Sequence, residues 1–85
     1  MSYYNDIALE KAIKEAEREY DWDISYRETG TEEIGSSTLD HYRVFVDGQY
    51  AQDEARDSFS EFYFYSVSVF TTGHSYCELE IAIRD

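Results

Sequence analysis

The sequence predicts an α+β fold in which an N-terminal helix packs on one face of an antiparallel sheet of about four strands. Apolar residues recur at three- and four-residue spacing over residues 5–20, which is a helical period. After Asp21 the period changes to two, and the later segments are separated by hairpin-length turns. With 85 residues, the chain has the length of a single domain spanning residues 1–85.

The first element expected is a helix from about residue 5 to residue 20. Its apolar positions share one face, because residues three and four apart are neighbours on a helix. Asn5 or Asp6 can accept a hydrogen bond from the free amides of the first turn. The residues predicted to face the sheet are Leu9, Ala12, Ile13, Ala16 and Tyr20.

Alternating residues then predict the first strands. Trp22, Ile24 and Tyr26 alternate with polar residues over about 22–27. Glycine and serine predict a loop over 30–37, followed by a second strand over about 38–46. Asp47-Gly48 is typical of a tight turn, after which residues 49–52 are expected to pair back on the second strand.

The last third of the chain is dense in aromatic residues. Residues 51–58 are predicted to form a short helical turn or a charged loop, and residues 59–72 a strand. A turn at 72–74 leads to the last strand, over 75–84. That strand has the cleanest alternation, with one face formed by Cys77, Leu79, Ile81 and Ile83.

The net charge is −12, from 19 acidic and 7 basic residues. Such a field speeds encounter with basic partners and argues against direct binding to nucleic acid or to an anionic membrane. The single cysteine excludes an internal disulfide, residues 1–20 lack the pattern of a signal peptide, and no apolar stretch approaches the length of a membrane span. We therefore expect a cytoplasmic protein, in the host cytoplasm if phage-encoded.

The sequence contains no recognisable catalytic motif. His41, His74 and Cys77 have no zinc-ligand spacing, and Cys77 is predicted to be a core residue because it shares the apolar face of its strand. The four glycines are scattered, so no phosphate-binding loop is expected. These features favour a non-enzymatic protein without a metal or cofactor. A small enzyme or ligand-binding domain, with a cavity near His41 between helix and sheet, stays open as an alternative.

The acidic residues are unevenly distributed. Residues 15–33 contain eight acids against Arg18 and Arg27, which is six of the twelve excess charges. Several crowd the end of the predicted helix, where the macrodipole favours cations. The cluster is either a solvated face or one continuous negative rim that contacts a basic partner. The residues predicted for that contact are Glu15, Glu17, Glu19, Asp21, Asp23, Glu32 and Glu33.

The aromatic residues are the second unusual feature. Nine tyrosines and five phenylalanines exceed what a core of this size needs. In the stretch Phe62-Tyr63-Phe64-Tyr65, both faces of the expected strand are aromatic, and tyrosine is favoured at interfaces. The face away from the helix could be enclosed or could form a homodimer. The predicted anchors for a partner are Tyr63, Tyr65 and Tyr76.

Together these features predict an acidic, non-enzymatic binding protein that inhibits a basic nucleic-acid-binding protein, either by mimicking nucleic acid or by blocking its surface. In size, charge and lack of motifs the chain is similar to small phage anti-restriction and anti-CRISPR proteins, and no shared motif assigns residues. The alternative, which rests on the same attraction between an acidic surface and a basic partner, is an immunity protein or antitoxin that neutralises a basic nuclease toxin.

Overall fold

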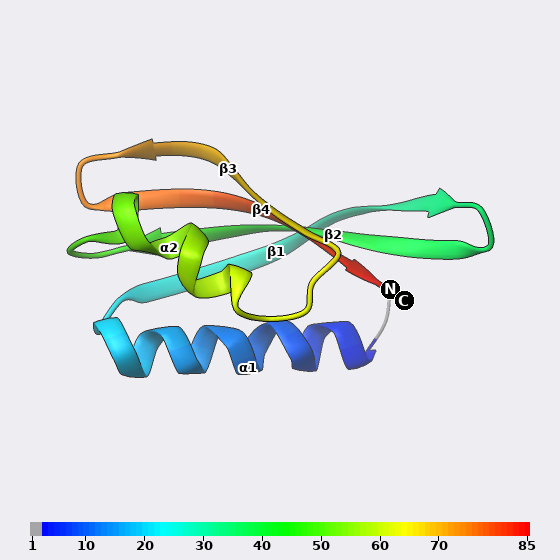
Figure 1. The fold of residues 1–85 in the computed structure, drawn as a ribbon, viewed down its shortest axis with the longest axis horizontal. Helices are drawn as coiled ribbons and strands as arrows, with labels where there is room; N and C mark the ends of the chain where they lie inside the picture. The colour runs from blue at the N-terminus through cyan, green and yellow to red at the C-terminus, as the bar shows by residue number, and fades with distance from the viewer. Residues whose placement is uncertain (1–2) are drawn as a thin grey trace.

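The computed structural model describes residues 3–85 and confirms the α+β class, with two helices and a four-stranded antiparallel sheet (Figure 1). The strand order in the sheet is β1-β2-β4-β3, so β1 and β3 form its edges. Among the described residues, no helix is long and apolar enough to span a bilayer. The elements are α1 (Tyr3–Tyr20), β1 (Asp23–Ile34), β2 (Ser37–Asp47), α2 (Ala51–Ser60), β3 (Ser66–Gly73) and β4 (Tyr76–Arg84).

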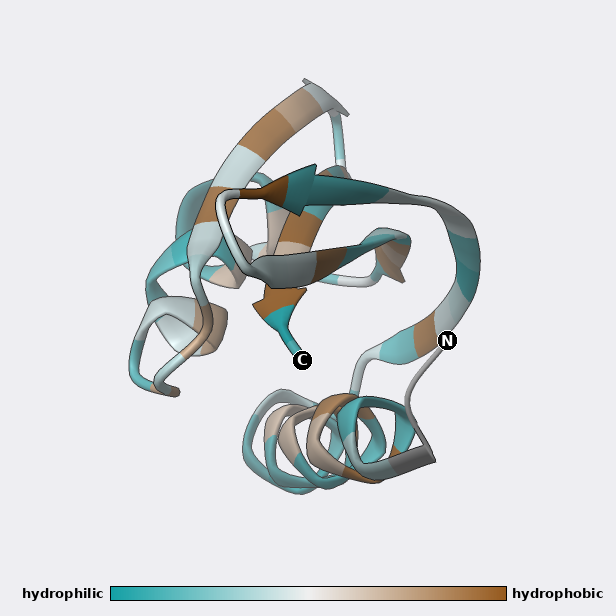
Figure 2. Cartoon of the chain, turned by 90° about the vertical axis from the view of Figure 1, so that its right-hand side faces the viewer, coloured by the Kyte–Doolittle hydropathy of each residue, from teal (hydrophilic) through white to brown (hydrophobic). Residues whose placement is uncertain are grey.

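Both helices pack on the same face of the sheet, and the core lies between these two layers. Figure 2 shows the sheet above α1, seen from the tip of the β1–β2 hairpin. The predicted inner face of α1 is confirmed, since Leu9, Ala12, Ile13 and Ala16 are buried there. The sheet and α2 contribute Tyr42, Val44, Val46, Ala51, Ala55, Phe59, Cys77, Leu79, Ile81 and Ile83.

Two tyrosines of the sheet bind carboxylates of α1. The hydroxyl of Tyr26 donates to Glu10 Oε2 at 2.6 Å, and the hydroxyl of Tyr42 donates to Asp6 Oδ1 at 2.7 Å. The hydrogen bond to Glu10 is the main reason that the pKa of Tyr26 rises to about 12. Two of the acidic residues therefore hold the helix on the sheet, since hydrogen bonds to charged groups are among the stronger ones.

The first hairpin is longer than predicted. β1 continues through Gly30 to Ile34, and only Gly35 and Ser36 lie in the turn, so the loop expected over 30–37 is wrong. Gly30 follows a β-bulge, where the register with β2 shifts, and a bulge accommodates glycine inside a strand. Gly35 has a φ of 61°, which glycine adopts without the steric cost of a side chain.

The Asp47-Gly48 pair does not form the expected hairpin turn. Gly48, with a φ of 150°, and Tyr50, with a φ of 71°, redirect the chain into α2, so residues 49–52 do not pair with β2. The helical turn predicted over 51–58 is confirmed and extends to Ser60.

Residues 59–65 are not part of the strand predicted over 59–72. Phe59 is fully buried on α2, because Ala51, Ala55 and Phe59 recur every four residues and form one helical face. The chain then crosses to the far edge of the sheet, where β3 begins at Ser66. The last strand is confirmed as β4, with its predicted apolar face buried.

Candidate functional site

Five segments meet at one end of the molecule, on the left in Figure 1. They are the end of α1, the start of β1, the end of β2, the start of α2 and the β3–β4 turn. Trp22 Nε1 donates to the carbonyl of Gln49 at 2.7 Å, and the amide of Gly48 donates to the carbonyl of Ser75 at 2.9 Å. These hydrogen bonds join segments that are far apart in the sequence.

The segments that meet there, residues 19–24, 47–54 and 72–77, contain six acidic residues and no lysine or arginine. We call this region the acidic end. Its acidic residues have opposite effects on the two helices. Those at the start of α2 interact favourably with the macrodipole of that helix, whereas those at the end of α1 interact unfavourably with the macrodipole of α1. The residues are Glu19, Asp21, Asp23, Asp47, Asp53 and Glu54.

Asp21 occupies a strained position in the acidic end. Its φ is 58°, in the left-handed region, and its amide donates to the carbonyl of Glu17 at 3.0 Å to close the last turn of α1. Glycine is the usual residue at such a helix end. An acidic residue there combines a backbone cost with an unfavourable charge at the helix C-terminus.

The acidic end also changes the titration of a neighbouring tyrosine. Tyr20 stacks on Trp22, with ring centroids 4.1 Å apart. Partial burial, followed by the charges of Glu19, Glu54 and Glu61, raises the pKa of Tyr20. Carboxylates from α1 and from both ends of α2 therefore act on the same hydroxyl.

Three residues of the acidic end form a row across the sheet, which we call the acidic row. Asp23 of β1 is opposite Asp47 of β2, and Asp47 is opposite Tyr76 of β4. Directly opposite side chains have Cβ atoms about 4.5–5.5 Å apart, so the two carboxylates repel each other. Tyr76 stacks on Phe45 at 5.6 Å. Both aspartates are exposed, so the row combines accessible negative charge with an aromatic surface.

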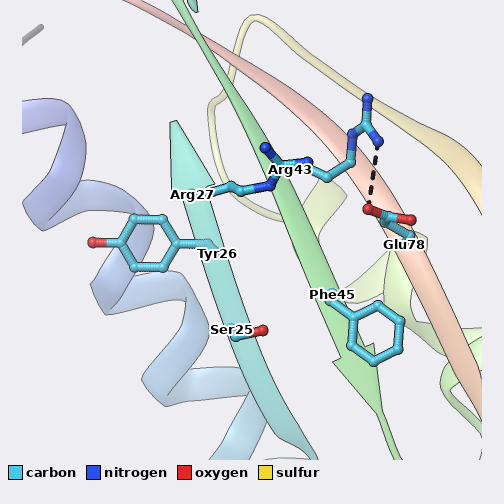
Figure 3. Close-up of a pocket in the computed structure, with 6 residues that line it drawn as sticks. All are labelled: Ser25, Tyr26, Arg27, Arg43, Phe45 and Glu78. Atoms are coloured by element: carbon cyan, nitrogen blue, oxygen red, sulfur yellow. Dashed lines mark hydrogen bonds and ion pairs between the residues drawn. The ribbon is translucent and has the colours of Figure 1, made fainter. Parts of the chain in front are cut away.

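The acidic row belongs to the side of the sheet away from the helices, which we call the open face. Strand alternation places on it Ser25, Arg27, Arg43, Phe45, Tyr76, Glu78 and Glu80. In Figure 3, Arg27 and Phe45 point away from α1, whereas Tyr26 points towards it. A shallow depression of about 110 Å³ next to the row is lined by Ser25, Arg27, Arg43, Phe45 and Glu78 of this face, together with Tyr26.

Arg43 is already occupied by neighbours on the open face. Its guanidinium is 3.4 Å from Glu78 Oε2 and 3.4 Å from Glu80 Oε2, and lies 3.6 Å from the centroid of the Phe70 ring. Figure 3 shows the contact with Glu78. Arg43 therefore offsets one of the two negative charges of Glu78 and Glu80.

The predicted single negative rim is wrong in its geometry. Glu32 and Glu33 lie near the tip of the β1–β2 hairpin, nine and ten residues along β1 from Asp23. At about 3.3 Å per residue this is roughly 30 Å. Glu32 is paired with His41, with 2.9 Å between Oε1 and Nε2. Strand extension therefore divides the acidic cluster between the two ends of the molecule.

The other predicted acidic residues lie on α1. Glu15 pairs with Arg18 at 2.5 Å on the exposed surface of the helix, so its charge is locally matched. Glu17 is half-buried, two residues before Glu19 on α1. Of the seven predicted acids, the structure brings Glu19, Asp21 and Asp23 together.

The three predicted tyrosine anchors are also separated. Tyr63 and Tyr65 lie in the connection between α2 and β3, so the expectation of a strand with two aromatic faces is wrong there. Both are exposed, Tyr63 completely. The amide of Tyr65 donates to the carbonyl of Ala82, near the end of β4, whereas Tyr76 is at the start of that strand. Only Tyr76 joins the acidic row.

Sequence reasoning missed Asp47, Asp53 and Glu54. The pair Asp47-Gly48 predicts a turn, whereas in the structure β2 continues through Asp47. The four-residue repeat of Ala51, Ala55 and Phe59 was the available signal for α2 and thus for the position of its first-turn acids.

The residues that could have indicated chemistry do not gather into a site. Within residues 3–85, no group of three histidine, cysteine or acidic side chains is placed to hold a metal. Cys77 is 1% exposed, which confirms its core position, and burial raises the pKa of its thiol. His41 pairs with Glu32 on the hairpin, and His74 is exposed in the β3–β4 turn.

Comparison of the chain with protein-family models, with curated proteins and with solved structures finds no match. Function is therefore inferred from the acidic end and the open face alone.

Proposed function

We propose that this chain is an acidic, non-enzymatic binding protein that covers a basic, nucleic-acid-binding surface of another protein. The observation that carries the proposal is the acidic row, in which Asp23, Asp47 and Tyr76 are cross-strand neighbours on the open face. Residues 19–24, 47–54 and 72–77 of the acidic end contain no lysine or arginine, and the arginines of the open face, Arg27 and Arg43, lie four residues along their strands from Asp23 and Asp47.

The chemistry of the row suits an arginine- or lysine-rich partner. Carboxylates accept paired hydrogen bonds from a guanidinium, as phosphates do. Asp23 and Asp47 repel each other in the free protein, and a cation placed between them would remove that repulsion. Tyr76 on Phe45 offers an aromatic surface of the kind that forms the desolvated centre of interfaces. Charge would then speed association while the aromatic pair slows dissociation.

Two classes of partner present such a surface: an enzyme that binds nucleic acid as part of a defence system, and a nuclease toxin. In the first case the chain would act as an inhibitor of the anti-CRISPR or anti-restriction kind, and in the second as an immunity protein or antitoxin. The same row would serve both, so the captured partner and its activity decide between them.

The experiment compares two charge-reversed variants. Asp23→Lys/Asp47→Lys alters the acidic row, and Glu32→Lys/Glu33→Lys is the matched control at the hairpin tip. Each pair of reversals changes the formal net charge from −12 to −8. The immobilised proteins capture partners from a cell lysate, and the affinity of each purified partner is then measured with and without a competing DNA duplex.

We expect the row variant to lose at least about a hundredfold in affinity, because a reversed charge pair at an interface costs several kcal/mol. The hairpin variant should lose much less, since its reversed charges lie at the other end of the molecule. DNA should compete with the wild-type protein for the partner. Equal losses in both variants, or a partner that binds DNA and this chain simultaneously, would contradict the proposal.

A further inference from the structure

The two edges of the sheet differ in their protection against pairing with another strand. β1 carries five charged residues and a bulge, both of which discourage addition of a further strand. β3 has the sequence SVSVFTTG, with no charged residue and no proline, in a chain whose net charge is −12. In Figure 2, β3 is the upper strand and is coloured from white to brown. Its outward amides and carbonyls therefore lie on an uncharged edge.

The stretch 65–69 of this edge is complementary to itself. Tyr65 lies directly before β3, and its amide already donates to the carbonyl of Ala82 in β4. Tyr65 and Val69 are 54% and 43% exposed, and the alternation of β3, continued back by one residue, places both on the same side as Val67. The bulge of β3 comes after Val69, so the stretch before it keeps a regular register with β4. Ser66 and Ser68 occupy the other side and add no charge.

We propose that two copies of this chain pair through β3, antiparallel about a two-fold axis at Val67, to form one continuous eight-stranded sheet. In this register Tyr65 of each copy is opposite Val69 of the other, and Val67 is opposite its own copy. Aromatic and β-branched residues form favourable cross-strand pairs, and the two exposed side chains on each copy become covered. The serines at 66 and 68 face each other on the other side.

The antiparallel arrangement also separates the charges of the two copies. The acidic end lies at the Gly73 end of β3, since Gly73 pairs with Tyr76 of the acidic row. Gly73 is six residues from Val67 in each copy, so the two acidic ends are about 40 Å apart at 3.3 Å per residue. The Debye length is about 8 Å at physiological ionic strength, so these charges are screened from each other. A parallel pairing would bring them together.

This inference does not depend on the proposed function, because the contact uses β3 and leaves the acidic row exposed. If the pairing occurs, each dimer carries its two acidic rows on the same face of the eight-stranded sheet, at opposite ends. The other conceivable occupant of the β3 edge, a basic peptide strand from a different protein, predicts a monomer in isolation.

The test measures molar mass by light scattering at micromolar and millimolar protein concentrations and about 0.15 M salt. The wild-type chain should reach twice its mass of 10.0 kDa at the higher concentration. Tyr65→Lys/Val69→Lys and Tyr65→Glu/Val69→Glu should each stay at the monomer mass, because like charges become direct neighbours across the axis. An equimolar mixture of the two should recover the doubled mass, since lysine then faces glutamate. Ser25→Lys/Thr31→Lys, the control on β1, should dimerise like the wild type.

A wild-type mass of 10.0 kDa at both concentrations would overturn the proposal. So would a mixture that stays monomeric, or a β1 control that loses the dimer. Hydrogen exchange on the wild-type protein gives a measurement that needs no variant to fold. Amides of 65–69 should gain protection as the concentration rises while those of β1 do not, and the opposite pattern would refute the β3 contact.

Discussion

Replacing Asp21 with glycine tests how much stability the chain loses by carrying a charge at the acidic end. Asp21 has a φ of 58° at the end of α1. The left-handed conformation costs a non-glycine residue about 1 kcal/mol or slightly more, and a negative charge at a helix C-terminus costs about 0.3–1 kcal/mol. The glycine variant loses about 0.5–1 kcal/mol of that gain, because glycine has more conformational freedom in the unfolded chain. The expected net gain is about 1 kcal/mol.

The assay is urea unfolding at neutral pH, followed by the fluorescence of Trp22 and by circular dichroism. Trp22 is the single tryptophan and is buried, so unfolding changes its environment. In thermal unfolding followed by the same two signals, a gain of about 1 kcal/mol should raise Tm by about 4–8 °C in a chain of this length. Asp21→Asn is the matched control, because asparagine tolerates the left-handed region and lacks the charge. It should show only the charge contribution, which salt should diminish.

Two results would refute this reasoning. If Asp21→Gly is less stable than the wild-type protein, the backbone cost and the charge cost together are smaller than the ~0.5–1 kcal/mol that glycine loses on folding. If glycine gives no more than asparagine, the left-handed conformation costs Asp21 no more than the ~0.5–1 kcal/mol that glycine loses through its greater freedom in the unfolded chain. A stabilised variant that also binds the basic partner more weakly would link the strain to binding, as expected where function opposes stability.

Three further predictions concern the packed part of the molecule. The hydrogen bond to Glu10 raises the pKa of Tyr26 from 10.0 to about 12, so the stabilising contribution of this bond is complete below pH 10 and is lost as the pH rises towards 12. Tyr26→Phe should therefore make the alkaline decline in unfolding free energy shallower, and an unchanged slope would contradict this reasoning. Gly48→Ala should lower the unfolding free energy in urea by about 1–3 kcal/mol, because the added Cβ would lie 2.6 Å from the indole of the buried Trp22. Gly30→Ala is the control, since its Cβ would meet nothing within 4 Å, and it should leave the unfolding free energy unchanged or raised. Cys77 should react with a thiol reagent more than about a hundredfold faster in denaturant than in buffer, and comparable rates would show that its strand opens readily.

The sequence by itself determined the elements whose periodicity is local and strong. The inner face of α1 and the alternation of β4 were predictable, because one buried face imposes its period on consecutive residues. The core position of Cys77 followed from the same alternation. The excess of negative charge is a matter of composition and needed no fold.

The predicted secondary structure was wrong where a residue's own preference competed with another local pattern. Phe59 and the aromatic residues after it have high strand propensity, but the four-residue spacing from Ala51 allowed α2 to bury Phe59 instead. Gly30 predicts a loop, although a bulge in a long hairpin accommodates glycine equally well. Burial of Phe59 against the core in the first case, and pairing of β1 with β2 in the second, outweighed the preference of the individual residue.

The location of the acidic row was decided only by the tertiary structure. Asp23 and Asp47 are far apart in the sequence and become neighbours through the register of β1 with β2, while the same extended strand carries Glu32 away to the hairpin tip. Tyr76 joins them through β4, which pairs with β2. Strand pairing is a non-local choice made by burial of the whole apolar face, so the charge of this chain was evident from its residues, but the surface on which that charge gathers was not.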